Sequence, residues 1–204
     1  MTLLTILLLA GAVLLTRVSC LRTAIGILGF QSVIVALACS IIGINTGEFH
    51  MYIAAALTVI IKVGLIPYAL WKVASQLKQE REIANFNISF LLAILVIIAS
   101  YGFVGRELPL VSGETLAAAV AITAIGLLMI MTRRQAILQV VGLITMENGL
   151  YLLGLSITRG LPLIIELGIF FDVLVAVVIL VILAQRLKHS FETTDTSILN
   201  ELKG

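Results

Sequence analysis

The sequence predicts an all-α polytopic membrane protein with about seven transmembrane helices, its N-terminus outside and its C-terminus in the cytoplasm. Of its 204 residues, 61% are hydrophobic and only 12% are charged, whereas a soluble domain is about 25% charged. Apolar segments of about 20 residues, long enough to cross a bilayer, recur along the chain. Basic residues gather in alternate loops. These features leave no large soluble domain that could hold a catalytic core.

Seven apolar segments are expected to span the membrane as helices. They cover roughly residues 2–16, 21–44, 51–71, 86–105, 115–132, 136–156 and 162–185. The first could pass for the apolar part of a signal peptide. However, it lacks a basic stretch in front and the next apolar segment follows at once, so we interpret it as a retained span. The fourth contains no charged residue, which indicates a structural role.

The basic residues determine the expected orientation. Ten of the thirteen lie on the side that the chain reaches after an odd number of spans: Arg17, Arg22, Lys72, Lys78, Arg81, Arg133, Arg134, Arg186, Lys188 and Lys203. The opposite side has two, Arg106 and Arg159, and Lys62 lies within a span. By the positive-inside rule the ten-residue side is cytoplasmic. Arg133 and Arg134 are interpreted as topology anchors or phospholipid contacts.

An internal repeat is one reading of the sequence. The stretch TRVSCLRTAIGILGFQS aligns with TRRQAILQVVGLITMEN at an offset of 116, which places Gln31 on Glu147 and Ser32 on Asn148. A chance match between apolar helices remains the alternative. A true repeat would make spans one to three and five to seven two modules of the same direction. The expected units are a three-helix module 1–71, a cytoplasmic linker and fourth span 72–105, a three-helix module 106–185 and a cytoplasmic tail 186–204.

Four ionisable residues lie inside the predicted spans: Lys62, Glu147, Glu166 and Asp172. At about 1.5 Å of helical rise per residue, Lys62, Glu147 and Asp172 all lie about 15–16 Å into their spans, near the middle of a slab about 30 Å thick. Glu166 lies about one turn inside the outer end. An ionised group at this depth costs about 2.5–3.5 kcal/mol on insertion scales, so it needs a partner. Lys62 could pair with either Asp172 or Glu147.

These groups suit two roles. Buried ion pairs or protonated acids can fix helix packing. Alternatively, buried carboxyls and lysines can change charge near neutral pH and pass protons through ordered water. The surroundings favour close helix contact and extra hydrogen bonding: Gly168 lies one turn before Asp172, Asn148 follows Glu147, and Pro67 is expected to free backbone carbonyls one turn after Lys62.

The stretch RRQAILQVVGLITMENGLYLLGL resembles the second helix of the small three-helix subunit shared by respiratory complex I and Mrp-type antiporters. The resemblance rests on Arg133, Arg134, Gly142, Leu143 and Asn148. The carboxylate of the complex I helix falls on Ile144 of this chain, and Glu147 lies three residues later. Asp172 corresponds in depth to the carboxylate of that family's third helix. KVGLIPYALW, with Lys62, Pro67 and Trp71, is spaced like a stretch of the large antiporter-like subunits, in which the lysine is thought to take part in proton transfer.

The longer run ENGLYLLGLSITRGLPLIIELGIFFDVLVAV resembles component E of hydrogenase-4, a membrane subunit of group 4 [NiFe] hydrogenases of the formate hydrogenlyase type. The resemblance implies a multi-pass subunit of the cytoplasmic membrane that has no catalytic centre of its own. Its buried charges would form part of a proton or sodium path. Iron–sulfur clusters and the nickel–iron centre would lie in peripheral hydrogenase subunits, and antiporter-like subunits would be its membrane partners.

Two other functions remain open: a subunit of a cation/proton antiporter or other complex I-related complex, and a membrane anchor whose charges only hold helices together. An enzyme active site is least expected, because the chain shows no His/Cys cluster or nucleophile motif. Cys20 and Cys39 form no metal-binding pair and are interpreted as core residues. We find no pattern of nucleic-acid binding.

Overall fold

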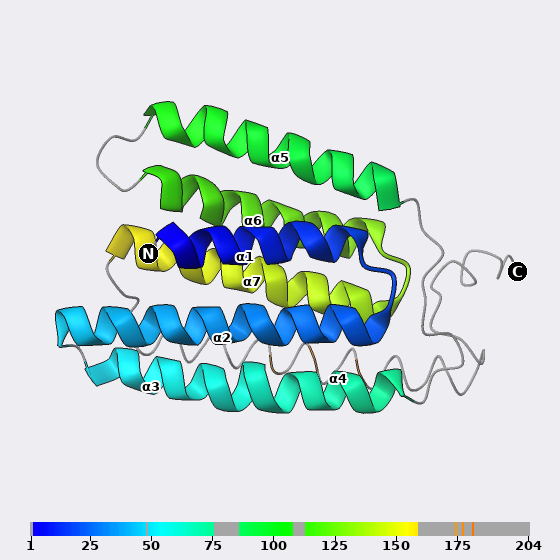
Figure 1. Cartoon of the computed structure of the whole chain (residues 1–204), viewed down its shortest axis with the longest axis horizontal. Helices are drawn as coiled ribbons and strands as arrows, with labels where there is room; N and C mark the ends of the chain where they lie inside the picture. Colours follow the sequence, from blue (N-terminus) through cyan, green and yellow to red (C-terminus); the bar gives the residue numbers. More distant parts are fainter. Residues whose placement is uncertain are drawn as a thin grey trace, which may run out of the picture.

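A computed structural model of the chain describes residues 2–47, 49–75, 86–107 and 113–158, together with Leu174, Val177 and Val181. These residues form a bundle of helices that run in alternating directions (Figure 1). The helices are α1 (Thr2–Arg17), α2 (Leu21–Thr46), α3 (Phe49–Leu57), the π-helix η1 (Thr58–Leu65), α4 (Ile66–Ala74), α5 (Phe86–Glu107), α6 (Gly113–Thr132) and α7 (Ala136–Thr158).

The first six expected spans coincide with these helices to within a few residues, with α3, η1 and α4 together forming the third. Four segments are long and apolar enough to cross a membrane, and α1 and the apolar part of α5 are shorter. The seventh expected span, 162–185, lies outside the described residues except for three positions. The all-helical class is therefore confirmed for the described chain, and the count of seven spans and the orientation stay predictions.

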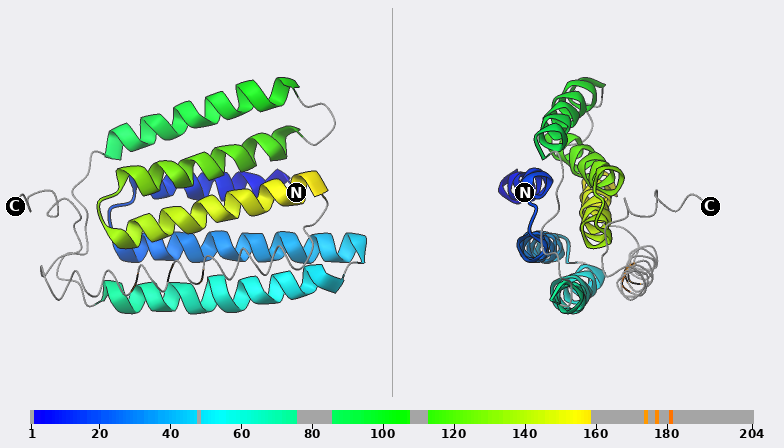
Figure 2. Two further views of the ribbon diagram at one scale, coloured as in Figure 1. Left: turned by 180° about the vertical axis from the view of Figure 1, so that it is seen from behind. Right: turned by 90° about the vertical axis from the view of Figure 1, so that its right-hand side faces the viewer.

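The α6–α7 hairpin is the centre of the bundle. α1 packs against α6 and α2 against α7, while α5 covers α6 on the outer edge and the α3–η1–α4 segment packs on α2. The end-on view of Figure 2 shows α1 and α2 beside the α6–α7 pair. A side chain of α7 can therefore face α2, and the α3–η1–α4 segment lies close to both helices.

Helix boundaries follow local chemistry. α2 ends where Gly47 adopts a left-handed conformation, with φ of 70°, and its N–H donates to the Gly43 carbonyl. Glycine reaches this region without the steric cost that a Cβ would bring. At the opposite end of the bundle, α1 leads into α2 and α6 into α7 through links of only three residues each. The two hairpins thus have matching links, although the repeat itself stays a prediction.

The core consists of two apolar clusters. One contains Leu21 and Leu28 of α2 with Ile137 and Ile144 of α7, and Val177 packs in it. The other contains Ile34 and Cys39 of α2 with Tyr151 and Leu152 of α7. Along both helices, a short interval separates the two clusters. Large apolar side chains are also exposed around the outside, as expected for a surface in contact with lipid.

Candidate functional site

The interval between the two apolar clusters contains a layer of buried polar side chains, which we call the polar layer. It comprises Gln31 and Ser32 of α2, Thr58 and Lys62 of η1, and Thr145, Glu147 and Asn148 of α7. All seven are at most 3% exposed. Their position in the helices corresponds to the middle of the expected spans, where uncompensated polar groups are costly.

Lys62 is the one cation in this layer, and it is positioned by an unusual stretch of helix. Residues 58–65 are π-helical, with hydrogen bonds to the fifth residue back rather than the fourth. The N–H of Ile66 continues this pattern by donating to the Ile61 carbonyl. Pro67 follows immediately, and its ring lacks an N–H and crowds the carbonyl four residues earlier. The expected disturbance before Pro67 therefore takes the form of a π-helix, a feature that often occurs at functional sites.

The Lys62 ammonium lies between two side chains of α7. Its Nζ is 2.7 Å from Glu147 Oε1 and donates a hydrogen bond of 3.0 Å to Asn148 Oδ1. The side chains of the ion pair are 0% and 3% exposed. Of the two pairings that the sequence left open, the structure contains Lys62 with Glu147. The contact joins the α3–η1–α4 segment to α7, and Lys62 and Asn148 are 86 residues apart in the sequence.

Two polar atoms at this contact can still form hydrogen bonds. Glu147 Oε2 and Asn148 Nδ2 have no hydrogen-bond partner among the described residues. Buried polar atoms are normally bonded to protein or to ordered water. At 2.7 Å a proton can pass directly between the ammonium and the carboxylate, and an ordered water on Oε2 would extend the relay. The arrangement is thus chemically able to exchange protons in an otherwise apolar interior.

A second contact in the polar layer connects α1, α2 and α7. Gln31 Nε2 donates to the Leu8 carbonyl at 3.3 Å, and Thr145 Oγ1 contacts Gln31 Oε1 at 3.4 Å while donating to Val141 O at 2.8 Å. Thr145 lies three residues before Asn148, one turn along α7. Only one feature of the sequence pointed to Gln31, its alignment with Glu147 in the proposed repeat. No sequence pattern indicated the hydrogen bond of 3.1 Å from Cys39 Sγ to the hydroxyl of Tyr151, which lies one turn beyond Glu147.

Glycines fix the depth at which α7 packs against α6. A Cβ on Gly126 would lie 2.6 Å from Met146 Cα, and one on Gly142 would lie 2.8 Å from Met129 Cβ. A Cβ on Gly149 would lie 2.9 Å from Thr123 Cα. No side chain fits at these separations, so the two backbones touch. Gly142, which the sequence analysis grouped with the site, therefore acts through the α6–α7 contact that holds Glu147 in place.

Arg133 differs from its expected role. It is 2% exposed, and its guanidinium donates to the carbonyls of Leu15 and Thr16 at 2.8 and 2.7 Å. These carbonyls belong to the last turn of α1, where no intrahelical donor is available. The interpretation of Arg133 as a lipid contact was wrong: its side chain ties the α6–α7 link to the end of α1. Arg134 is exposed.

The remaining predicted site residues lie outside the described residues. These are Glu166, Gly168 and Asp172. Of the predicted set, the structure brings together Lys62, Glu147 and Asn148, with Pro67 one turn from Lys62. No group of three or more His, Cys, Asp or Glu side chains suited to a metal ion occurs within the part of the chain that the structure describes.

Comparison with known proteins adds an independent finding. Hydrogenase-4 component E of Escherichia coli (strain K12) is 28% identical over 207 residues, an alignment that covers 96% of this chain and 96% of that protein. The component E of Shigella flexneri gives the same values. The chain is thus similar to hydrogenase-4 component E. An uncharacterised protein of Mycobacterium tuberculosis (strain ATCC 25618 / H37Rv) is 27% identical over 190 residues, 90% of this chain and 86% of that protein.

The similarity to hydrogenase-4 component E extends over nearly the whole chain, well beyond residues 147–177, which carry the resemblance in the sequence. No family model matches the chain, and no solved structure matches it significantly.

Proposed function

We propose that this chain is an integral membrane subunit of a hydrogenase-type complex, and that Lys62, Glu147 and Asn148 form part of its ion path. The ion would be a proton or sodium, moved across the cytoplasmic membrane as electrons pass through partner subunits. Similarity to hydrogenase-4 component E along nearly the whole chain supports the assignment to such a complex. The iron–sulfur clusters and the nickel–iron centre would be held by those partners.

The observation that carries the ion path is the buried contact of Lys62 with Glu147 and Asn148. A buried ion pair is weak evidence for stability, because desolvation of the two charges offsets much of their attraction. A membrane anchor could hold its helices together with apolar residues at lower cost. A pair that exchanges protons instead needs two ionisable groups, a short separation between them, and a further polar atom that can pass the proton on. The contact of Lys62 with Glu147 has the first two, and Glu147 Oε2 is such an atom.

The test is ion translocation by the assembled complex in proteoliposomes, with hydrogenase turnover measured in parallel. Glu147→Gln keeps the size of the side chain but cannot carry the proton. The double variant Lys62→Met/Glu147→Gln removes both charges of the pair. We expect both variants to assemble and to translocate less ion per electron, because neither can pass a proton between positions 62 and 147. Glu114→Gln, at an exposed carboxylate at the start of α6, is the matched control.

A double variant that assembles and pumps at the wild-type ratio would show that the pair only holds helices together. The same assay applies to Asp172→Asn, which we expect to lose pumping because Asp172 is predicted at the same depth. Measuring proton and sodium uptake separately identifies the ion. Failure of redox subunits to copurify with the chain would instead favour a cation/proton antiporter subunit.

A further inference from the structure

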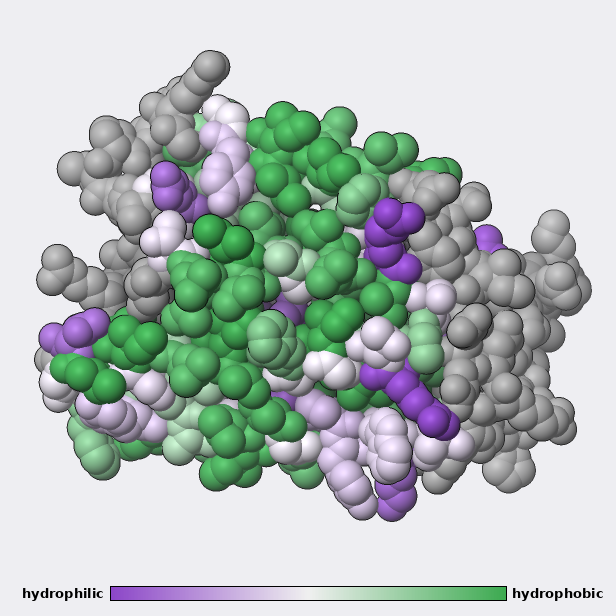
Figure 3. Space-filling view, in the orientation of Figure 1, coloured by the Kyte–Doolittle hydropathy of each residue, from purple (hydrophilic) through white to green (hydrophobic). Residues whose placement is uncertain are grey.

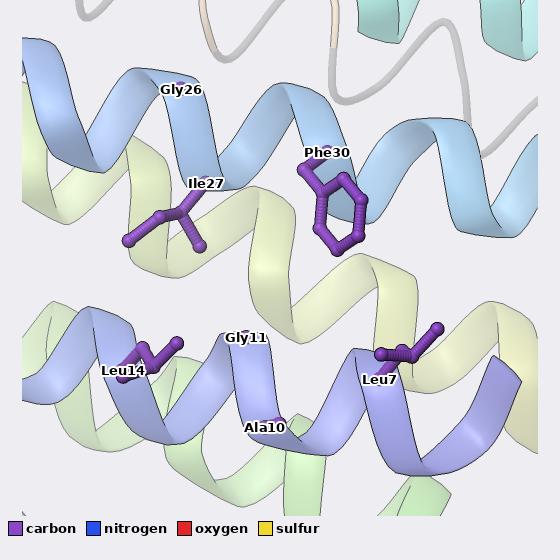
Figure 4. A pocket seen from close by; sticks show the side chains of 7 residues that line it. All are labelled: Leu7, Ala10, Gly11, Leu14, Gly26, Ile27 and Phe30. Atoms are coloured by element: carbon purple, nitrogen blue, oxygen red, sulfur yellow. The ribbon is translucent and has the colours of Figure 1, made fainter. Parts of the chain in front are cut away.

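A groove opens between α1 and α2 on the outer surface of the bundle, on the face seen in Figures 1 and 3. We call it the α1–α2 groove. Its volume is about 270 Å³, and all its lining residues are apolar. Leu7 and Leu14 of α1 stand opposite Ile27 and Phe30 of α2, as Figure 4 shows. Gly26 leaves α2 open, because a Cβ there would meet nothing within 4 Å.

The groove is apolar along its length but cationic at one end. From Leu7 to Leu14 it extends about 10 Å at the rise of a helix. Arg17 follows Leu14 by three residues and Arg22 precedes Gly26 by four, so both lie at the end where α1 leads into α2. Both arginines are exposed. Figure 3 shows hydrophilic residues at this end of the bundle and also at the opposite end, with a mainly apolar surface between them.

The Arg17 guanidinium is held at this end on the side of α1 that faces α5. It lies over the ring of Phe90 of α5, 5.0 Å from the centroid. A cation–π contact of this kind restricts the long side chain without neutralising its charge. Basic residues at the cytoplasmic membrane surface attract anionic lipids, with a gain of about fivefold in binding for each residue.

We propose that the α1–α2 groove binds an anionic phospholipid, with one acyl chain between α1 and α2 and the phosphate against Arg22 at the mouth. Charge complementarity at the mouth supports this occupant. The small volume of the groove also supports a lipid, because a helix of a partner protein is about 10–12 Å wide with its side chains and would not fit. Phe30 and Leu14, on either side of the opening, are more than half exposed. A slender acyl chain fits between them.

The experiment is native mass spectrometry of the full chain in detergent, titrated with phosphatidylglycerol or with phosphatidylcholine of the same acyl chains. Gly26→Leu fills the groove, and nothing near its Cβ opposes the new side chain. Gly102→Leu on α5 is the matched control, since a Cβ there also meets nothing within 4 Å. Arg22→Gln removes charge at the mouth, and Phe30→Ala removes one wall.

We expect one phosphatidylglycerol to bind more tightly than phosphatidylcholine. Gly26→Leu should abolish that preference, Phe30→Ala should weaken it, Arg22→Gln should lower binding about fivefold, and Gly102→Leu should change nothing. Equal binding of the two lipids would overturn the proposal, as would retained selective binding in Gly26→Leu. If Gly26→Leu fails to fold, unchanged binding in Phe30→Ala would have the same effect. A photoreactive group at position 30 that labels a protein helix in the assembled complex, rather than lipid, would assign the groove to a partner subunit instead.

Discussion

Lys62 shows how one side chain connects parts of the chain that are distant in sequence. Its stem runs through the apolar interior of the bundle and its ammonium reaches two adjacent residues of α7. Glu147 and Asn148 offer it a charge and an amide oxygen in the same turn. Removal of either charge leaves the other in a medium that solvates it poorly, so the two residues are expected to behave as one unit.

A double-mutant cycle on thermal unfolding of the detergent-solubilised chain tests this coupling. Lys62→Met and Glu147→Gln should each destabilise the protein by about 3–5 kcal/mol, because each leaves a buried charge without its ion-pair partner. The double variant should recover much of the loss, since both charges of the pair are removed together. Additive losses in the double variant would mean that the two groups do not interact in the membrane domain.

At the scale of helices, the position of the site depends on how closely α6 and α7 approach. Gly126 and Gly142 let the two backbones meet, and Gly149 continues the contact beyond Glu147. Small residues at such crossings are typical of membrane helices, which associate by packing rather than by exclusion from water. The π-helix of η1 sets the other half of the site, because it determines the side on which Lys62 leaves its helix.

Alanine substitutions test the α6–α7 crossing. A Cβ on Gly126 would lie 2.7 Å from the Gly142 carbonyl oxygen, so Gly126→Ala should force the helices apart and cost about 1–3 kcal/mol in thermal stability. It should also reduce pumping without removing any polar group. Gly102→Ala, in open space on α5, should change neither property and is the control. Normal stability of Gly126→Ala would argue against backbone contact at this crossing.

For the whole molecule, the alternating helices place the α1–α2 and α6–α7 links at the same end of the bundle (Figure 1). The exposed Arg17, Arg22, Lys72 and Arg134 all lie at or near that end. This agrees with the basic residues that the sequence analysis assigned to the cytoplasmic side. The direction of the bundle in the membrane still rests on the positive-inside rule.

Cysteine labelling tests the orientation in intact cells. In a variant in which Cys20 and Cys39 are replaced by alanine, a cysteine at position 134 should react only after the membrane is permeabilised. A cysteine at position 110, in the link before α6, should react with an impermeant reagent from outside. The reverse pattern would show that the bundle is inserted the other way and that its basic loops face outward.

Part of the fold was predictable because a bilayer imposes a minimum length on apolar helices. That requirement located α1, α2, the α3–η1–α4 segment, α5, α6 and α7 to within a few residues. Helical rise alone predicted Lys62 and Glu147 at the same level of their helices, and their side chains meet in the structure. The contact of Arg133 with the end of α1 was not predicted, because a basic residue in a short loop looks the same in the sequence whether it faces lipid or caps a neighbouring helix.

The sequence by itself determined the helices, the level of the charged residues within them and the resemblance to hydrogenase-4 component E. The tertiary structure decided which charges meet. The structure contains the contact of Lys62 with Glu147, whereas Asp172 lies outside the described residues. The sequence predicted Glu147 and Asp172 at the depth of Lys62, and depth says nothing about the direction in which a side chain leaves its helix. That direction depends on the π-helix before Pro67 and on the glycine contact that sets α7 against α6. The π-helix has a local cause in Pro67, but the meeting of Lys62 with α7 arises from packing between segments far apart in the chain, which no local pattern of residues records.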